Sequence, residues 1–180
     1  MTGYSSGKLG SHQTVAFRDV FDKHAPFVFR VMRHLGVPEA DLQDQCQEVF
    51  IAVYQGLETF EGRSALTTWL YGICLRVAST YRRRALSRAE VPAERLPDSD
   101  VPPSQHDSVE QDQAWSQLRQ LLEELDEQKR QVFVLYELEE LPMKQVAQLC
   151  DCPLQTAYSR LHAARRIVME RFRRRTGVAP

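Results

Sequence analysis

Residues 154–175 read LQTAYSRLHAARRIVMERFRRR, and the fold of the chain is best worked out from this stretch. Its apolar residues recur at steps of three and four, which predicts one apolar stripe on a helix. The stripe consists of Leu154, Ala157, Leu161, Ala164, Val168 and Phe172. Another face carries Gln155, Tyr158, Ser159, His162 and Arg166. Pro153 precedes the helix at a position where the missing N–H of proline costs nothing.

A shorter helix is predicted just upstream, over Met143–Cys150, and the chain then breaks tightly at Asp151 and Cys152. Two short helices joined by such a break, the second one polar outside and rich in arginine, are typical of a helix-turn-helix. The second helix would fit the major groove of B-DNA, with its arginines on the phosphates. The alternative is a basic amphipathic helix packed in a bundle, whose arginines are merely solvated.

Composition sets broad limits on the class of protein. A length of 180 residues corresponds to one large domain or two small ones, and an apolar fraction of 43% is enough for a core. No run approaches the length of a transmembrane helix. The first residues, MTGYSSGKLGSHQ, lack the apolar segment of a secretory signal. We therefore expect a cytoplasmic protein without membrane insertion.

The net charge of −1 hides a strongly uneven distribution of charge. Residues 65–89 hold five arginines and no acid, and residues 153–175 hold seven arginines and one acid. Between them, residues 108–141 hold nine acids against three basic residues. Two basic helices separated by an acidic stretch indicate two separate contacts with a polyanion.

No segment alternates like a strand, and the periodic segments are helical, so an all-α fold is expected. Residues 89–107 hold four prolines, several acids and no aromatic residue, which favours a flexible, extended linker. This predicts two small helical domains, 1–88 and 108–180, on a Pro-rich linker at 89–107, the second ending in the helix-turn-helix. The expected helices before that motif are Thr14–His24, Pro26–Gly36, Glu39–Phe60, Ala65–Arg88, Ser108–Leu125 and one from Asp126, its N-cap, to Leu138.

The cysteines offer little chemistry. Cys46 and Cys74 lie on apolar helix faces and are expected to be small core residues. Cys150 and Cys152 form a C-x-C pair, which leaves a metal or redox role open, although no second ligand pair at suitable spacing accompanies it. No nucleophile–base pair or metal cluster is evident, so we expect neither catalysis nor a cofactor.

Two stretches of the first domain stand out. Asp44, Gln47 and Glu48 share a helix face beside Phe50 and Tyr54, which makes a reasonable partner-binding surface or an ordinary solvated face. From Thr67 to Arg84, aromatic, hydroxyl and basic residues are interleaved on one helix, a mixture that suits opened or single-stranded DNA. For Trp69 the alternative is core packing, and for the closing arginines it is a favourable interaction with the helix dipole.

Taken together, these motifs resemble an extracytoplasmic-function sigma factor of the bacterial sigma-70 family. The motifs are DQCQEVF at 44–50, FEGRSALTTWLYGICLRVASTYRRR at 60–84 and LPMKQVAQLCDCPLQTAYSRLHAARR at 141–166. The resemblance covers 17–88, like sigma region two, and 111–172, like sigma region four. It implies a factor that binds core RNA polymerase and directs it to promoters. The implied partners are the clamp helices of the β′ subunit, the flap of β, promoter DNA and an anti-sigma factor.

The resemblance also implies three sets of site residues. The polymerase-docking set is Asp44, Gln47, Glu48, Phe50 and Tyr54. The set that opens and captures the minus-ten element is Glu61, Gly62, Arg63, Ser64, Thr68, Trp69, Tyr71, Arg76, Arg82, Arg83 and Arg84. The minus-thirty-five set is Tyr158, Ser159 and His162 for base edges, with Gln155, Thr156, Arg160, Arg165 and Arg166 beside them, mostly nearer the phosphates.

Some positions depart from the pattern of the family. Many relatives carry Asn at Arg76, Arg at Tyr158 and Ala163, and Gly at Asp151 and Gln155. Promoter preference therefore does not transfer from better known members. Two other classes stay open: a plain helix-turn-helix regulator that does not bind polymerase, which leaves residues 39–88 unexplained, and a C-x-C redox or metal enzyme.

Overall fold

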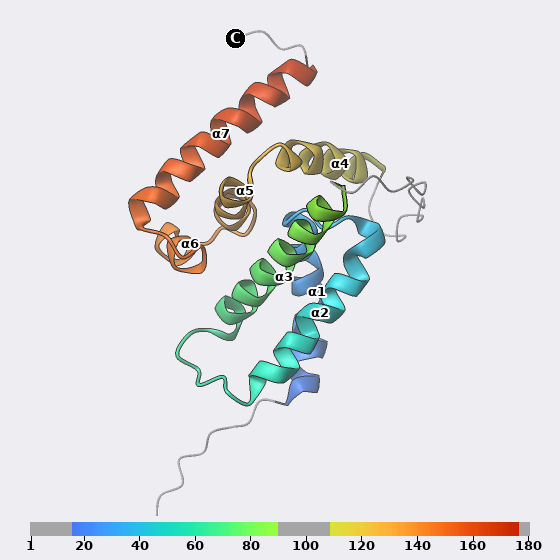
Figure 1. Cartoon of the computed structure of the whole chain (residues 1–180), viewed down its shortest axis with the longest axis vertical. Coiled ribbons are helices and arrows are strands. Elements are labelled where there is room, and N and C mark those ends of the chain that lie inside the picture. The colour runs from blue at the N-terminus through green and yellow to red at the C-terminus, as the bar shows by residue number, and fades with distance from the viewer. Residues whose placement is uncertain (1–15, 90–108, 177–180) are drawn as a thin grey trace, which may run out of the picture.

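The computed structural model describes residues 16–89 and 109–176, and every regular element in these ranges is a helix (Figure 1). We call the first group the upstream half: α1 (Phe17–His34), α2 (Glu39–Leu57) and α3 (Leu66–Ala89). The downstream half holds α4 (Val109–Glu123), α5 (Glu127–Phe133), the π-helical turn η1 (Val134–Leu138), α6 (Met143–Leu149) and α7 (Leu154–Thr176). The predicted all-α fold is confirmed. The predicted linker lies outside the described residues, except for Ala89.

The upstream half is a three-helix bundle whose apolar faces meet in one core. Val28, Val49 and Leu70, one from each helix, are each fully buried. Helix α1 ends where the sequence predicts, because Gly36 adopts a φ of 89° that suits glycine. The Val37 N–H then donates to the Met32 carbonyl at 3.2 Å and closes the helix end.

The start of the chain folds differently from the prediction. The sequence predicted a break between helices Thr14–His24 and Pro26–Gly36, but α1 runs unbroken from Phe17 to His34 with Pro26 inside it. Pro26 is exposed and removes one backbone donor from the helix. Val20 before it and Val31 after it are both buried in the same core. Burial on both sides of the proline therefore outweighs the lost hydrogen bond.

The downstream half follows the predicted order of helices. The Asp126 side chain accepts the Lys129 N–H at 2.9 Å, so the predicted N-cap is confirmed. The following helix reaches Leu138, as predicted, although its last turn is π-helical. None of the helices in the described ranges combines the length and apolar character needed to cross a bilayer.

The helix-turn-helix has the predicted form. Asp151 takes a φ of 46°, and the Cys152 N–H donates to the Ala147 carbonyl at 3.0 Å, which closes α6. Ala157, Leu161 and Ala164 of the predicted apolar stripe are fully buried, whereas its ends, Leu154 and Phe172, are each 46% exposed. The stripe therefore fixes which face of α7 points to solvent.

Arg130 is a buried cation that holds the end of α4. Arg130 is only 2% exposed. Its guanidinium donates to the carbonyls of Leu122 at 2.6 Å, Glu123 at 3.1 Å and Leu125 at 2.6 Å. Carbonyls at the end of a helix lack partners within the helix, and Arg130 supplies them from the next helix.

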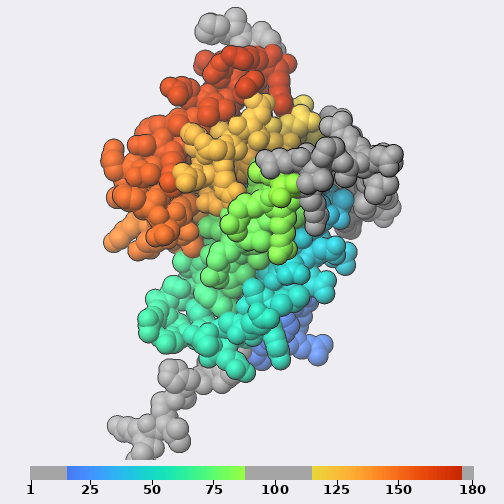
Figure 2. All heavy atoms as spheres, in the orientation of Figure 1, coloured from blue at the N-terminus to red at the C-terminus, as the bar shows by residue number. Residues whose placement is uncertain are grey.

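The two halves pack against each other, and their buried residues form one continuous cluster. Figure 2 shows the gold atoms of α4 and α5 lying directly against the green atoms of α3. Gln131 of α5 donates to the Ser79 hydroxyl at 3.0 Å, and Gln145 of α6 donates to the Thr68 hydroxyl at 2.8 Å. The downstream half therefore covers part of α3.

Trp115 also belongs to this contact between the halves. The residue is 38% exposed, so only part of its side chain is covered. The indole stacks on the His34 ring of α1, with centroids 4.7 Å apart and planes 19° from parallel. The stacking partner of Trp115, His34, therefore lies in the other half of the chain.

Candidate nucleic-acid and docking interface

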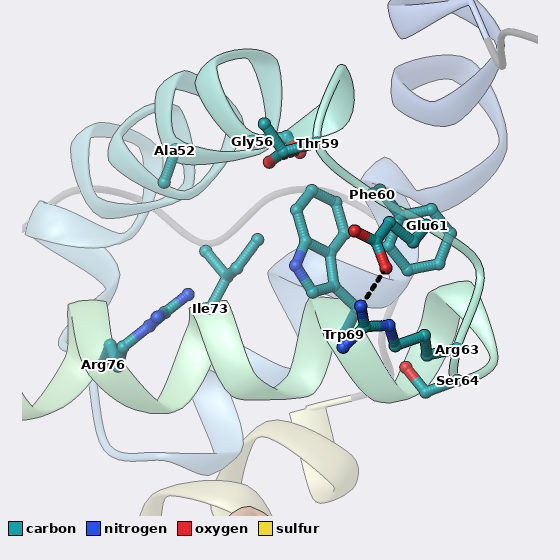
Figure 3. Close-up of a pocket in the computed structure, with 10 residues that line it drawn as sticks. All are labelled: Ala52, Gly56, Thr59, Phe60, Glu61, Arg63, Ser64, Trp69, Ile73 and Arg76. Atoms are coloured by element: carbon teal, nitrogen blue, oxygen red, sulfur yellow. Dashed lines mark hydrogen bonds and ion pairs between the residues drawn. The ribbon is translucent and has the colours of Figure 1, made fainter.

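A pocket of about 460 Å³ opens between the end of α2 and the start of α3 (Figure 3). One wall is the indole of Trp69, which lies 5.0 Å from the Phe60 ring. Residues from α2, the following loop and α3 complete the lining: Ala52, Gly56, Thr59, Phe60, Glu61, Arg63, Ser64, Ile73 and Arg76. The sequence-predicted minus-ten residues Glu61, Arg63, Ser64, Trp69 and Arg76 therefore converge on one hollow.

Gly56 allows Trp69 to lie where it does. A Cβ atom at Gly56 would come within 2.8 Å of the indole Cζ2 atom, closer than real Cβ contacts allow. The indole is half-buried, so it packs on α2 and also presents surface to the pocket. The two interpretations of Trp69, packing and base stacking, are thus compatible in this geometry.

Charge around the pocket is mostly positive. Arg63 forms an ion pair with Glu61 at 2.5 Å in the loop, where Gly62 takes a φ of 67°. Arg76, Arg83 and Arg84 are exposed along α3. Arg82 is half-buried, and burial lowers the pKa of its guanidinium. A half-buried aromatic platform followed by arginines on one helix can hold a single strand by stacking and phosphate contacts.

Two predicted minus-ten residues are not free in this arrangement. The Thr68 hydroxyl accepts the hydrogen bond from Gln145, and Tyr71 is 5% exposed. The Tyr71 hydroxyl donates to a Glu139 carboxylate oxygen at 2.8 Å. Burial, together with this hydrogen bond to an anion, raises the pKa of Tyr71. The downstream half therefore occupies the face of α3 that carries these two side chains.

The predicted docking face lies on α2. Asp44, Gln47, Glu48 and Tyr54 are exposed, whereas Phe50 is 5% exposed. Phe50 packs on Phe21 with ring centroids 4.7 Å apart and forms the floor of an apolar groove of about 560 Å³. The groove is lined by Phe17, Phe21, Phe29, Gln43, Cys46, Gln47, Phe50, Ile51 and Tyr54.

Three groove residues were missed as functional candidates in the sequence. Phe21, Phe29 and Ile51 are 42%, 37% and 43% exposed, an unusual display of large apolar side chains. Only the geometry between α1 and α2 shows that these side chains line an open groove next to the acidic face.

The outer face of α7 carries the predicted base readers. Gln155, Tyr158, Ser159 and His162 are exposed on this face. The Ser159 hydroxyl donates to the Gln155 carbonyl at 3.0 Å, an interaction within the helix that it would have to leave to bind a base. Thr156 and Arg160 are half-buried beside them.

The arginines that follow differ in their environment. Arg165 forms an ion pair with Glu137 at 2.5 Å and lies 5.6 Å from the Tyr136 ring centroid. Arg166 is exposed, and within the described residues its guanidinium forms no salt bridge. Arg166 is therefore the better placed of the two for a phosphate.

Cys150 and Cys152 of the C-x-C pair are free thiols of intermediate burial. Burial and the neighbouring Cys152 raise the pKa of the Cys150 thiol to about 12, so it stays protonated at neutral pH. Over the two described ranges, no three side chains of the ligand-forming types gather as a metal would require. Cys46 and Cys74 are buried core residues, as predicted.

Comparison with known proteins agrees with this geometry. A model of Sigma-70 region 2 matches residues 20–88, and a model of Sigma-70, region 4 matches residues 115–168. The ECF RNA polymerase sigma-E factor of Escherichia coli (strain K12) is 32% identical over 148 residues, which cover 73% of this chain and 74% of that protein. The sigma-E factor of Haemophilus influenzae is 32% identical over 141 residues, with 73% and 75% covered.

Solved structures share the fold. The sigma factor RpoE, in complex with the anti-sigma factor NepR from Bartonella quintana, has a TM-score of 0.67 at 20% identity, over 86% of this chain and 94% of that one. CnrH in complex with the cytosolic domain of CnrY has a TM-score of 0.64 at 21% identity, over 90% of each chain. With both sigma regions matched in order, the chain belongs to the sigma-70 family and is an RNA polymerase sigma factor of the extracytoplasmic-function group.

Proposed function

We propose that this sigma factor docks on core RNA polymerase through α2, captures the minus-ten element at the Trp69 pocket and reads the minus-thirty-five element with α7. One observation carries the proposal: a half-buried aromatic platform flanked by exposed arginines lies on the same chain as a complete helix-turn-helix. Such a factor acts where RNA polymerase acts, in the cytoplasm. It supplies promoter recognition and contributes no catalytic group of its own.

At the minus-ten element, Trp69 offers a face on which a flipped base can stack. Arg63 and Arg76 on the pocket rim, with Arg83 and Arg84 further along α3, hold the phosphates of the displaced strand. The pocket volume of about 460 Å³ is sufficient for one base. Because the downstream half bonds to Thr68 and Tyr71, their part in capture requires that half to move.

At the minus-thirty-five element, the exposed face of α7 enters the major groove. Tyr158, Ser159 and His162 offer a ring, a hydroxyl and an imidazole to base edges, which favours modest discrimination at each position. Arg166 and Arg160 lie beside them for phosphates. Because none of the three readers is a bidentate arginine, the preferred sequence must be determined by selection.

Reversing the charge of the docking face should weaken polymerase binding. We expect Asp44→Arg combined with Glu48→Arg to lower the affinity for core enzyme by about tenfold, because opposed like charges replace complementary ones. Capture of core enzyme by the immobilised chain measures this. Glu58→Arg, an exposed reversal at the far end of α2, is the control and should bind normally. Undiminished capture by the double variant would remove α2 from the docking surface.

The phosphate role of Arg166 predicts a change in salt dependence. Arg166→Ala should weaken holoenzyme binding about equally on all promoter sequences and reduce the slope of log affinity against log salt by about one. Arg165→Ala should change the slope less, because Glu137 already neutralises its charge. Filter binding over a salt series checks both variants. A changed sequence preference with an unchanged slope would assign Arg166 to bases instead.

Run-off transcription with purified core enzyme on genomic fragments tests the whole proposal. The expected result is transcription from a specific set of promoters that requires the chain. A chain that bound duplex DNA but neither captured core enzyme nor supported transcription would be a plain helix-turn-helix regulator. An anti-sigma factor that binds this chain is also proposed, since the structurally similar RpoE was solved with one.

A further inference from the structure

Glu139, at the end of η1, is a carboxylate of the downstream half that is buried among donors of the upstream half. Its side chain is only 1% exposed. One oxygen lies 2.6 Å from His34 Nδ1, and the other accepts Arg30 Nη2 at 3.1 Å and the Tyr71 hydroxyl at 2.8 Å. We call these four residues the Glu139 cluster. It joins η1 to both α1 and α3.

The cluster is electrostatically complete. Burial raises the pKa of the Glu139 carboxyl, but the hydrogen bonds from His34, Arg30 and Tyr71 outweigh it and leave the pKa below its ordinary value. The carboxylate therefore stays charged while buried. The Trp115 indole stacks on the His34 ring of the cluster. A buried carboxylate is stable only while its donors stay in place, because removing one of them leaves the charge without compensation.

The same contact covers residues that the proposed function needs. Tyr71 is held inside the cluster, and the Thr68 hydroxyl accepts its hydrogen bond from Gln145 of the downstream half. Both residues belong to the minus-ten set. While the halves are packed as in Figures 1 and 2, a DNA strand cannot reach this face of α3.

In the packed arrangement, the two proposed DNA-binding surfaces also lie too close together to reach both promoter elements. The two elements lie about 25 base pairs apart by their names, which is about 85 Å of B-DNA. Gln145 contacts Thr68, and His162 follows 17 residues later through two helices and a tight turn. At 1.5 Å per helical residue, the readers of α7 lie within about 40 Å of Thr68. The halves must therefore separate before both elements are bound.

We propose that the packed arrangement is a closed form of this sigma factor that is unable to bind a promoter, and that the Glu139 cluster is the latch that holds it. This inference rests on the proposed function and adds regulation to the same surfaces. Apolar packing joins the halves, but the contacts also include hydrogen bonds from Gln131 and Gln145, which water can replace when the halves part. Core polymerase, by binding both halves, would draw the chain into the open form.

Substitutions on either side of the latch test it. Glu139→Lys places a cation against Arg30. Arg30→Glu does the converse from α1, where the arginine side chain is 53% exposed. Each variant should enlarge the radius of gyration of the full chain in small-angle X-ray scattering. Glu140→Lys is the matched control: it makes the same charge change at the next residue, which is exposed, and should stay compact.

Transcription assays then link opening to activity. At limiting chain concentration, Glu139→Lys and Arg30→Glu should each raise the apparent affinity for core polymerase by about tenfold, because a larger fraction of the chain is competent to bind. A wild-type radius of gyration in both variants would overturn the latch. Opening without any gain in affinity would overturn its inhibitory role. If the variants open and no form, wild type included, binds core polymerase, the proposed function fails while the latch stands.

Discussion

Arg130→Ala should lower the free energy of unfolding by about 3–5 kcal/mol, the largest stability effect expected for a polar residue of this chain. The substitution leaves the carbonyls of Leu122, Glu123 and Leu125 without the donors that reach them from Arg130. The Leu122 carbonyl keeps the Leu125 N–H at 3.1 Å, but the other two carbonyls lose the Arg130 donor. A buried acceptor without a partner costs about 1–3 kcal/mol, and a cavity adds to the loss. Urea denaturation followed by circular dichroism measures the change.

One further variant separates the hydrogen bonds of Arg130 from its charge, and a second variant serves as a control. Arg130→Lys keeps the charge but has one compact ammonium group in place of a fork, so we expect an intermediate loss. Arg173→Ala removes an exposed arginine from α7 and should change the stability by less than about 0.5 kcal/mol. A loss below about 1 kcal/mol for Arg130→Ala would show that the carbonyls find other partners.

Trp69→Ala should reduce open-complex formation by about 10- to 100-fold, which corresponds to the loss of stacking of one or two bases. The indole forms a wall of the minus-ten pocket and packs against Phe60, so its removal takes away the platform for the captured strand. Permanganate reactivity of unpaired thymines in the promoter, measured with reconstituted holoenzyme, reports the open complex directly.

The controls for Trp69 distinguish capture from packing. Trp69→Phe retains an aromatic face and should recover most of the activity. A purely structural role predicts instead that the thermal stability of the protein and promoter opening fall together in Trp69→Ala and Trp69→Phe. Holoenzyme binding to a fragment that carries only the minus-thirty-five element should be unaffected. If Trp69→Ala opened promoters normally, the pocket would have no role in strand capture.

Local patterns made much of this fold predictable. The stripe Ala157, Leu161 and Ala164 follows from helical periodicity, and the Asp126 cap and the stop at Gly36 follow from the chemistry of single residues. Pro26 shows the limit of such reasoning. A proline predicts a helix break when only its own segment is considered. The helix continues through Pro26 because Val20 and Val31, on either side of it, are buried in the core.

The candidate sites were predictable as sets of residues but not as surfaces. The resemblance to sigma factors supplied Trp69 and the docking residues. The pocket around Trp69, however, depends on how the loop after α2 folds back. Arg130 and Glu139 were missed because charged residues in an amphipathic pattern are normally solvated. Their partners lie elsewhere in the chain, and no periodicity in one segment can reveal a partner in another.

The π-helical turn η1 makes the length of one short segment decisive. Within it the Glu139 N–H donates to the Val134 carbonyl, five residues back, at 3.0 Å. Such a turn holds one residue more than an α-helical turn would. Deleting a residue from Val134–Leu138 would restore α-helical geometry and rotate the positions that follow by about 100°. In an evolving lineage, one lost codon here could turn Glu139 away from its donors while every codon for the four side chains survived.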